Sequence, residues 1–205
     1  RSPFMGVKYH VKNTNVDPAV VALHNFEGGY CGVNAVEGGK INICYLAHRD
    51  VMKGFNDLPS MEKSVLQANP VLEEILSSSE QLWPAPKVIN EISFATKTPV
   101  DNHVIMLGDA AGMITPLCGN GMAIAFHSAR ILANLFLEHS GSRREIELSY
   151  QEAWQKKFAA RLQTGRYVQK LFGRGKWSNF AVGLGNQLPS IAGWIMAQTH
   201  GEPFD

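Results

Sequence analysis

The chain has 205 residues, of which 45% are hydrophobic, a composition typical of a soluble globular protein with one large or two small domains. Nineteen basic and eighteen acidic residues leave a net charge of +1. Because no lysine and arginine cluster is interleaved with aromatic residues, nucleic acid is not an expected partner. No apolar run approaches the roughly 18 to 20 residues that a transmembrane helix needs, so we expect a soluble protein.

The cysteines and histidines suggest neither disulfides nor a metal site. Cys31, Cys44 and Cys118 are an odd number at wide spacing, which fits neither a disulfide framework nor a CxxC motif and favours a reducing, cytoplasmic compartment. The seven histidines include no pair at HxxxH or HxxEH spacing, so we predict no metal ligands. The first residue is Arg1 rather than methionine, which indicates a processed, trimmed or fragmentary chain.

The first part of the chain, residues 4–46, has the pattern of β-strands. Apolar residues alternate with polar ones in two stretches, and the glycine pairs at 28–29 and 38–39 supply turns. We therefore predict an antiparallel sheet of about four strands with one buried face. The alternating residues are Val7, Tyr9 and Val11, and then Ile41, Ile43 and Tyr45.

The rest of the chain is predicted to be mainly helical. Ser60 can cap one short helix, and Pro70 can start another after Asn69. Strand character returns in residues 87–98, and residues 103–107 predict a short strand buried on both faces. Longer helices are predicted over residues 121–138, 143–172 and 189–198. The second of these carries an apolar stripe that should face the core, made of Tyr150, Trp154, Phe158 and Leu162 and, slightly further round the helix, Tyr167 and Leu171.

One continuous stretch, "VIMLGDAAGMITPLCGNGMAIAFHSARILANLF" at residues 104–136, combines a strand, an acidic turn, a proline loop and a helix. Asp109 follows the strand, where a carboxylate can accept hydrogen bonds from sugar or polyol hydroxyls. Asn120 is a good N-cap, and the glycines on either side of it let a ligand approach the helix N-terminus. These features predict a ligand site but do not name the ligand. The alternative is a tight turn followed by an ordinary helix entry.

The part "GDAAGMITPLCGNGMAIAFHSARILA" resembles the second flavin-binding motif of FAD-dependent oxidoreductases of the para-hydroxybenzoate hydroxylase type, and is most similar to the geranylgeranyl reductase-like branch. The resemblance implies that Asp109, after Gly108, bonds a ribityl hydroxyl of FAD and that the loop at Pro116 runs beside the isoalloxazine ring. It further implies that helix N-terminal amides face N1 and the C2 carbonyl of the ring, where the helix dipole stabilises reduced flavin. The residues concerned are Gly119, Asn120, Gly121 and Met122.

A second stretch, "FEGGYCGVNAVEGGKINICY", resembles the substrate-domain strands of the same branch. The resemblance implies that Tyr30 and Asn34 lie on the substrate side of the flavin, although both could be ordinary sheet residues. For Cys118 we favour a small buried filler over a redox role. For His127 we favour a packed or surface residue over a ligand.

The GxGxxG element that binds the ADP half of FAD in complete members of this superfamily does not occur in this sequence. We therefore expect an α+β fold, in which an antiparallel substrate-domain sheet is joined to the C-terminal strand and helices of a glutathione reductase-like FAD-binding domain whose N-terminal Rossmann half is missing. That half would be a partner. The expected domains are residues 1–98 (substrate-domain sheet with short helices), 99–140 (second FAD-binding motif) and 141–205 (C-terminal helices).

The leading hypothesis is the C-terminal portion of an FAD-dependent oxidoreductase acting on a hydrophobic or aromatic small molecule, by prenyl-reductase-like reduction or by hydroxylation. NAD(P)H or another reductant would be the electron donor, no catalytic residue is identified, and the piece alone would be inactive. A non-catalytic binding fragment that has lost FAD is the alternative. A flavin-dependent halogenase ranks lower because "GGYCGVN" replaces the expected Trp-rich strand motif and no lysine matches. The apolar segment at residues 177–198 could touch a membrane, but we favour core packing.

Overall fold

The computed structural model describes residues 3–138 and 142–171, together with positions 190, 193 and 197. These residues form two compact units, which are described separately. The sheet unit lies within Arg1–Ser93, and the helical unit lies within Phe94–Lys170.

The sheet unit is built on a six-stranded sheet in which neighbouring strands run antiparallel. The strand order is β2-β3-β4-β1-β5, and β6 also pairs with β1. The four strands predicted between residues 4 and 46 are confirmed, as is the glycine turn between β3 and β4, where Gly38 and Gly39 have φ of 72° and 66°. The strands are β1 (Phe4–Lys12), β2 (Val21–Phe26), β3 (Gly29–Val36), β4 (Lys40–His48), β5 (Glu80–Gln81) and β6 (Lys87–Ile92).

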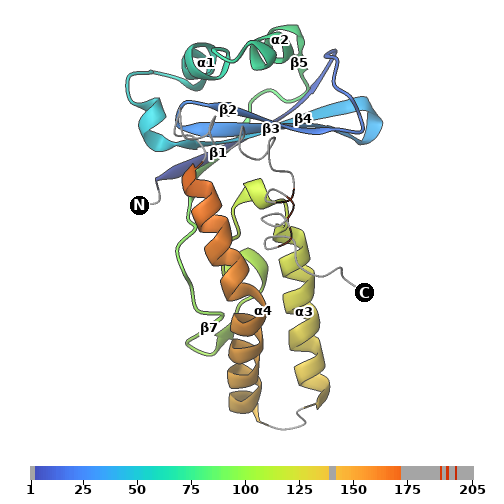
Figure 1. Ribbon diagram of the computed structural model, residues 1–205, viewed down its shortest axis with the longest axis vertical. Helices are drawn as coiled ribbons and strands as arrows, with labels where there is room; N and C mark the ends of the chain where they lie inside the picture. Colours follow the sequence, from blue (N-terminus) through green and yellow to red (C-terminus); the bar gives the residue numbers. More distant parts are fainter. Residues whose placement is uncertain (1–2, 139–141, 172–189, 191–192, 194–196, 198–205) are drawn as a thin grey trace. The chain divides into compact units, whose positions relative to one another are not determined.

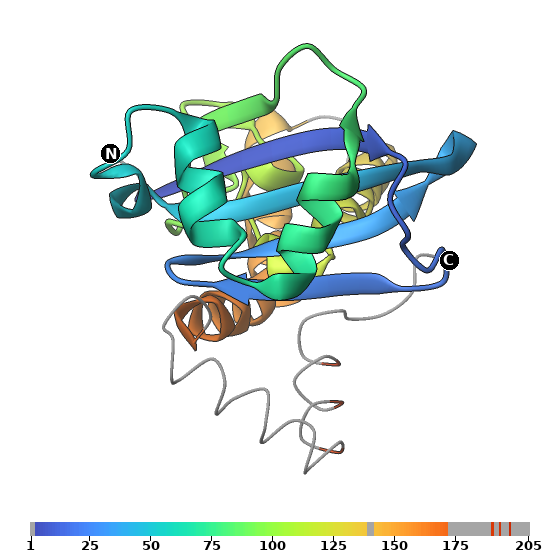
Figure 2. The same ribbon diagram turned by 90° about the horizontal axis from the view of Figure 1, so that it is seen from above.

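Short helices cover one face of this sheet and bury the predicted alternating residues (Figure 1). They are α1 (Leu58–Met61), a π-helical turn over Glu62–Leu66, and α2 (Pro70–Ser78). Figure 2 shows α1 and α2 lying across the strands of the sheet. The core of this layer contains Val7, Tyr9, Val11, Cys31, Val33, Ile41, Ile43 and Tyr45 from the sheet, and Met61, Leu66, Leu72 and Ile75 from the helices.

The two short helices begin at different kinds of cap. The prediction that Ser60 caps the first helix is wrong, because Asp57 is its N-cap and accepts a hydrogen bond from the Ser60 amide at 2.8 Å. The prediction for the second helix is confirmed: Pro70 is its first residue, and the Asn69 carboxamide oxygen accepts from the amides of Val71 and Leu72 at 3.0 and 3.4 Å.

Replacing Asn69 with alanine is expected to destabilise the sheet unit by about 1 kcal/mol, the usual cost of losing an N-cap. The loss removes two hydrogen bonds to backbone amides that the helix itself cannot satisfy. Urea unfolding followed by circular dichroism measures the effect, and Asn69→Asp, which keeps an acceptor oxygen, is the matched control. Equal losses in both variants would contradict a capping role.

The helical unit consists of a β-hairpin and two long helices that lie side by side (Figure 1). The hairpin strands, β7 (Val100–Asp101) and β8 (Val104–Ile105), are joined by two residues with positive φ, Asn102 and His103. The helices are α3 (Gly121–Glu138) and α4 (Arg143–Leu171), in agreement with the predicted bounds to within one residue. The core between these elements contains Ala111, Ile114, Cys118, Ile124, Tyr150, Trp154, Phe158 and Leu162.

Two predictions for the helical unit are wrong. The strand at residues 103–107 is only two residues long and is not buried on both faces, because Ile105 faces the core while Val104, pointing the opposite way, is 60% exposed. Tyr167 is 59% exposed rather than in the core stripe. It lies five residues after Leu162, and at 3.6 residues per turn this step rotates its side chain well away from the buried face. The helix predicted over residues 189–198 lies outside the continuously described residues.

Candidate functional site

Gly108, in the turn that follows β8, allows the chain to pass close to α3. Its φ is +52°, and a Cβ atom added there would lie 3.0 Å from the Cβ of Ala125. The Gly108 amide donates to Ser128 Oγ at 3.1 Å, and that hydroxyl donates to the Ala125 carbonyl at 2.9 Å. A larger residue would therefore push the turn away from the helix.

Asp109 lies beside the first residue of α3. A Cβ atom added at Gly121 would lie 3.8 Å from Asp109 Oδ1, so the carboxylate and the helix N-terminus are neighbours. The Asp109 side chain is exposed, and its backbone carbonyl accepts a hydrogen bond from Lys97 Nζ at 3.2 Å. The arrangement places an acceptor group for hydroxyls next to a region of positive helix dipole.

The proline loop between Asp109 and α3 is anchored to α4. Thr115 Oγ1 lies 3.2 Å from Cys118 Sγ and donates to the Gly165 carbonyl at 3.4 Å. A Cβ atom at Gly165 would come within 3.3 to 3.5 Å of Ile114, Thr115 and Cys118, so the glycine lets the loop lie against the helix. Cys118 is buried here, as expected for a small filler, and Pro116 on the same 3-10 turn is exposed.

The start of α3 keeps its backbone open to approach. Gly119 adopts φ of +65° and is exposed, and nothing lies within 4 Å of a Cβ atom added to it. Asn120 is in the predicted N-cap position, because its carbonyl accepts the first helical bond from the Ile124 amide at 3.2 Å. Met122 is 78% exposed. The seven predicted cofactor residues thus lie in two 3-10 turns, the loop after them and the start of α3, with Asp109 beside Gly121: Gly108, Asp109, Pro116, Gly119, Asn120, Gly121 and Met122.

Two residues that support this unit were missed by the sequence analysis. Ser128 holds the Gly108 amide, and Lys97 holds the Asp109 carbonyl. No spacing rule identifies either one, since their partners lie 20 and 12 residues away in the chain. His127, which the sequence suggested to be a packed or surface residue, is 1% exposed on the core-facing side of α3.

Tyr30 and Asn34, the predicted substrate residues, lie in the sheet unit. Both are on β3, on the face opposite to the one that α1 and α2 cover. Tyr30 is buried and stands opposite Leu46 of β4. Asn34 Oδ1 accepts a hydrogen bond at 3.0 Å from Nδ2 of Asn42, its direct partner on β4.

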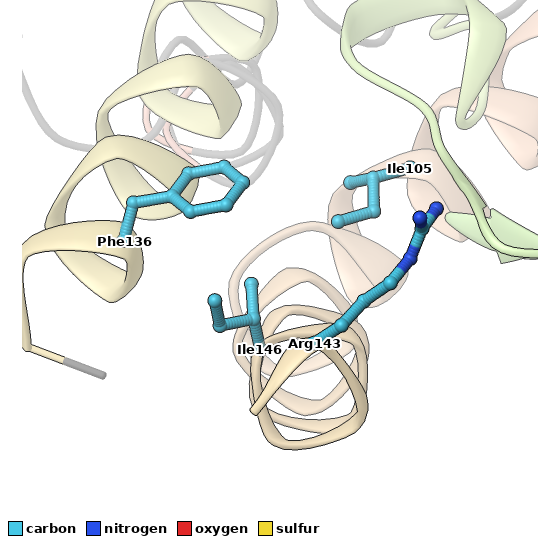
Figure 3. Close-up of a pocket in the computed structure, with 4 residues that line it drawn as sticks. All are labelled: Ile105, Phe136, Arg143 and Ile146. Carbon is cyan, nitrogen blue, oxygen red and sulfur yellow. The ribbon is translucent and has the colours of Figure 1, made fainter. Parts of the chain in front are cut away.

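A separate hollow of about 480 Å³ opens near the other end of the helical unit, where β8, α3 and α4 meet. Figure 3 shows Phe136 and Ile105 on its two sides with Ile146 between them. Its one charged lining residue, Arg143, already donates from Nε to Glu147 Oε1 at 2.8 Å and from Nη2 to the His103 carbonyl. The hollow is therefore apolar and does not coincide with the predicted cofactor residues.

Two features of the described part of the chain are relevant to its chemistry. Within it, no three histidine, cysteine, aspartate or glutamate side chains are arranged so that they could hold a metal ion. None of the helices seen there combines the length and apolar character required to cross a bilayer. All three cysteines are free.

A family model described as squalene epoxidase matches residues 72–159, which include all seven predicted cofactor residues. Among curated proteins, conditioned medium factor receptor 1 of Dictyostelium discoideum is 29% identical over 141 residues, covering 63% of this chain and 26% of that protein. The chain therefore spans well under half the length of this relative.

Solved structures of flavoproteins share the fold. The flavin-dependent brominase Bmp2 matches with a TM-score of 0.73 and 12% identity, covering 98% of this chain and 51% of its own. Klebsiella pneumoniae HpxO, complexed with FAD, matches with a TM-score of 0.69 and 17% identity, and the match covers 96% of this chain and 53% of HpxO. A geranylgeranyl bacteriochlorophyll reductase-like protein of Thermoplasma acidophilum matches with a TM-score of 0.61 and 17% identity, and the match covers 82% of this chain and 42% of that protein.

At these identities the solved structures establish a shared α+β fold, of which this chain spans about half. Several of the neighbours are named as flavin-dependent enzymes or as complexes with FAD.

Proposed function

We propose that this chain is the part of an FAD-dependent oxidoreductase that holds the ribityl and ring side of the cofactor. The observation that carries the proposal is the Asp109 carboxylate beside the N-terminus of α3, in the turn after β8 and next to Gly108 and Gly121. A carboxylate there would accept hydrogen bonds from ribityl hydroxyls, and the helix amides would face an electron-rich ring edge.

The residues present fit such a group. Gly119 and Gly121 leave open backbone where a flavin would have to approach, and the exposed Pro116 forms the adjoining edge of the loop. Bound FAD would supply the redox chemistry itself, either hydride transfer or reaction with oxygen. The contribution of this chain would be to bind and orient the cofactor and to favour negative charge at the ring edge that faces α3.

We propose a hydrophobic or aromatic small molecule as substrate, with NAD(P)H or another reductant as electron donor. The names of the squalene epoxidase family model and of the geranylgeranyl reductase-like neighbour both refer to isoprenoid compounds, which supports an apolar substrate. The sheet face that carries Tyr30 and Asn34 would contact it. Neighbours named as halogenases, as an FAD-bound protein and as a reductase-like protein share the fold of this chain, so the fold does not by itself choose among reduction, hydroxylation and halogenation.

The sequence gives reasons to place halogenation third. "GGYCGVN" stands where the Trp-rich strand motif of halogenases is expected, and no lysine occupies a matching position. Halogenase neighbours at 12 to 17% identity support the fold alone. The products formed by the longer gene product from an apolar test substrate, with and without bromide, distinguish the three reactions.

Asp109→Ala is expected to weaken FAD binding by about tenfold or more, because a hydrogen bond to a charged group contributes roughly 1.5 to 3 kcal/mol. The measurement is flavin absorbance near about 450 nm after gel filtration of the longer gene product that contains this chain. Asp101→Ala, which removes an exposed carboxylate on β7 in the same unit, is the control and should retain FAD.

Equal flavin content in both variants would contradict the role of Asp109. The non-catalytic alternative is favoured by one observation, namely that the chain spans about half of the flavoproteins it resembles. If the longer product with wild-type sequence also binds no FAD, that alternative replaces the enzyme hypothesis.

A further inference from the structure

The sheet face opposite to the one that α1 and α2 cover gathers most of the lysines of the sheet unit. Residues 3–93 contain ten acidic and seven basic side chains, so this part of the chain as a whole is acidic. Four of its six lysines nevertheless share this one face: three alternate along their strands with core residues, and the fourth stands directly opposite one of these three. We call them the lysine cluster: Lys8 and Lys12 on β1, Lys40 on β4 and Lys87 on β6.

Two members of the lysine cluster oppose each other on neighbouring strands. Lys8 and Lys87 are direct partners in the pairing of β1 with β6, and both are exposed. Like charges in direct opposition destabilise a sheet. Lys12 is paired with Glu80 at 3.0 Å, whereas Lys8, Lys40 and Lys87 form no ion pair with any carboxylate in the part of the chain that the structure describes. This face therefore carries positive charge that the fold does not neutralise.

An aromatic pair borders the lysine cluster. The His10 ring stacks on Trp83, with the ring centroids 4.5 Å apart and the planes inclined at 33°. Lys87 Nζ lies 5.9 Å from the centre of the Trp83 ring. Burial and two lysines of the cluster lower the pKa of His10, and Glu37 acts in the opposite direction. The positive charges of the cluster thus act on one region, beside an aromatic edge.

The other end of the same face is apolar. Val21 and Leu23 of the edge strand β2 are 73% and 48% exposed there. A Cβ atom added to Gly32 would lie 3.7 Å from Leu23 Cδ2, so the leucine side chain lies close to the glycine. The register continues from Gly32 through Cys44 to Lys8. Because neighbouring strands are about 4.8 Å apart, the apolar end lies roughly 14 Å from the lysine cluster.

The predicted substrate residue Asn34 lies between these two ends. Its partner on β4, Asn42, donates to Asn34 Oδ1 at 3.0 Å and stands opposite His10 of β1. From β2 to β6 the face thus presents apolar, then amide, then cationic side chains. No run of lysines in the sequence predicts this order, because the members of the cluster belong to three strands that are far apart in the chain.

We propose that this face binds the substrate as an amphipathic small molecule, with an anionic end at the lysine cluster and an apolar end at Val21 and Leu23. This inference rests on the proposed function, whose substrate it narrows to an apolar molecule that carries a phosphate or carboxylate group. The anion would neutralise the opposed charges of Lys8 and Lys87. A neutral apolar molecule cannot supply that stabilisation.

The test is isothermal titration calorimetry of this chain at low ionic strength with four probes: octyl phosphate, octanoate, octanol and inorganic phosphate. At least one of the two octyl acids should bind about fivefold or more tightly than octanol, because only the acids pair with the lysines. Inorganic phosphate, which lacks an apolar end, should bind more weakly than octyl phosphate. The tighter of the two acids identifies the anion as phosphate or carboxylate. Equal binding of octanol and both acids would overturn the proposal.

Lys8→Gln should weaken binding of the tighter acid by about fivefold, and Lys8→Arg, which keeps the charge, should retain it. Lys63→Gln is the matched control, since it removes an exposed lysine from the π-helical turn on the other side of the sheet. Because Lys8→Gln also removes one of two opposed like charges, its Tm should equal or exceed that of the parent protein. Equal weakening in Lys8→Gln and Lys63→Gln, or a lower Tm in Lys8→Gln, would contradict the role of Lys8.

Flavin content separates this inference from the proposed function, because binding of the acid by the sheet unit needs no flavin. Acid binding that depends on Lys8, in a longer gene product that holds no FAD, would leave the anion site in place and refute the proposed function. FAD that is held through Asp109, without any preference for the acids over octanol, would do the reverse.

Discussion

Replacing Gly29 with alanine is expected to destabilise the sheet unit by about 3 kcal/mol, at the upper end of the cost of overpacking a core. A Cβ atom at this position would lie 2.2 Å from the Leu46 carbonyl oxygen and 2.5 Å from the ring of Phe26. The ring could shift, but the carbonyl belongs to the backbone of β4, which is paired with β3 over its whole length. Relief of the clash therefore requires the two strands to separate.

The matched control is Gly32→Ala, three residues further along the same strand. Its added Cβ atom would meet the Cys44 carbonyl oxygen and Leu23 Cδ2 at 3.7 Å, an ordinary van der Waals distance. This variant should stay within about 1 kcal/mol of the parent protein. Calorimetry should show a fall in Tm of roughly 6 to 12 °C for Gly29→Ala and little change for Gly32→Ala. Similar shifts in the two variants would show that the close approach to Leu46 does not govern stability.

The requirement for glycine at position 29 illustrates what the sequence could and could not predict about the fold. Alternation of apolar residues was sufficient to predict the first four strands, because one covered face imposes a period of two. The pair at 28–29 was recognised as a turn signal, yet the reason for Gly29 is the approach of a neighbouring strand, which depends on register. The cap at Asp57 was missed because Ser60 is an equally good cap residue, and only the helix start decides between them.

The candidate site was predictable to the extent that its residues are consecutive. The turn after β8, the proline loop and the start of α3 follow one another, so the stretch from Gly108 to Met122 could be interpreted as one unit. The anchoring of that loop by Gly165 on α4 has no signal in the sequence, since it depends on how α4 packs. The burial of residues 103–107 was overestimated for a related reason. Both faces of this short strand are apolar, but within the helical unit only the face that carries Ile105 is packed against the core, and Val104 on the other face is exposed.

Glu62 is expected to make the stability of the sheet unit depend on pH, in the direction opposite to that of most carboxyl groups. Its side chain is partly buried in the π-helical turn, where Tyr45 Oη donates a hydrogen bond to Oε1 at 2.7 Å. Burial raises the pKa of Glu62 from 4.5 to about 7. Burial also raises the pKa of Tyr45, so the phenol remains a donor throughout this range.

The direction of this pH dependence follows from the number of protons that the folded and unfolded states bind. Between pH 4.5 and about 7 the folded chain keeps the Glu62 proton that the unfolded chain releases, so the free energy of unfolding falls as the pH rises through this window. The stabilisation that protonated Glu62 provides is complete below pH 4.5 and absent above about pH 7. The full pKa difference would correspond to about 3 kcal/mol, which we reduce to about 2 kcal/mol because water screens a partly exposed group.

The free energy of unfolding of Glu62→Gln should therefore equal that of the parent protein below pH 4.5 and exceed it by about 2 kcal/mol at pH 8. Urea unfolding of both proteins across this range measures the difference, and Glu74→Gln, on the exposed side of α2, controls for the loss of one carboxylate.

Tyr45→Phe tests the same balance from the other partner. Removing the donor withdraws a hydrogen bond that favours the charged carboxylate, which should raise the pKa of Glu62 further. The difference in the free energy of unfolding between Tyr45→Phe and the double variant that also carries Glu62→Gln should then keep growing above pH 7. A constant difference at every pH would mean that Glu62 does not titrate within the fold, and that its carboxylate is accommodated in the π-helical turn as the charged form.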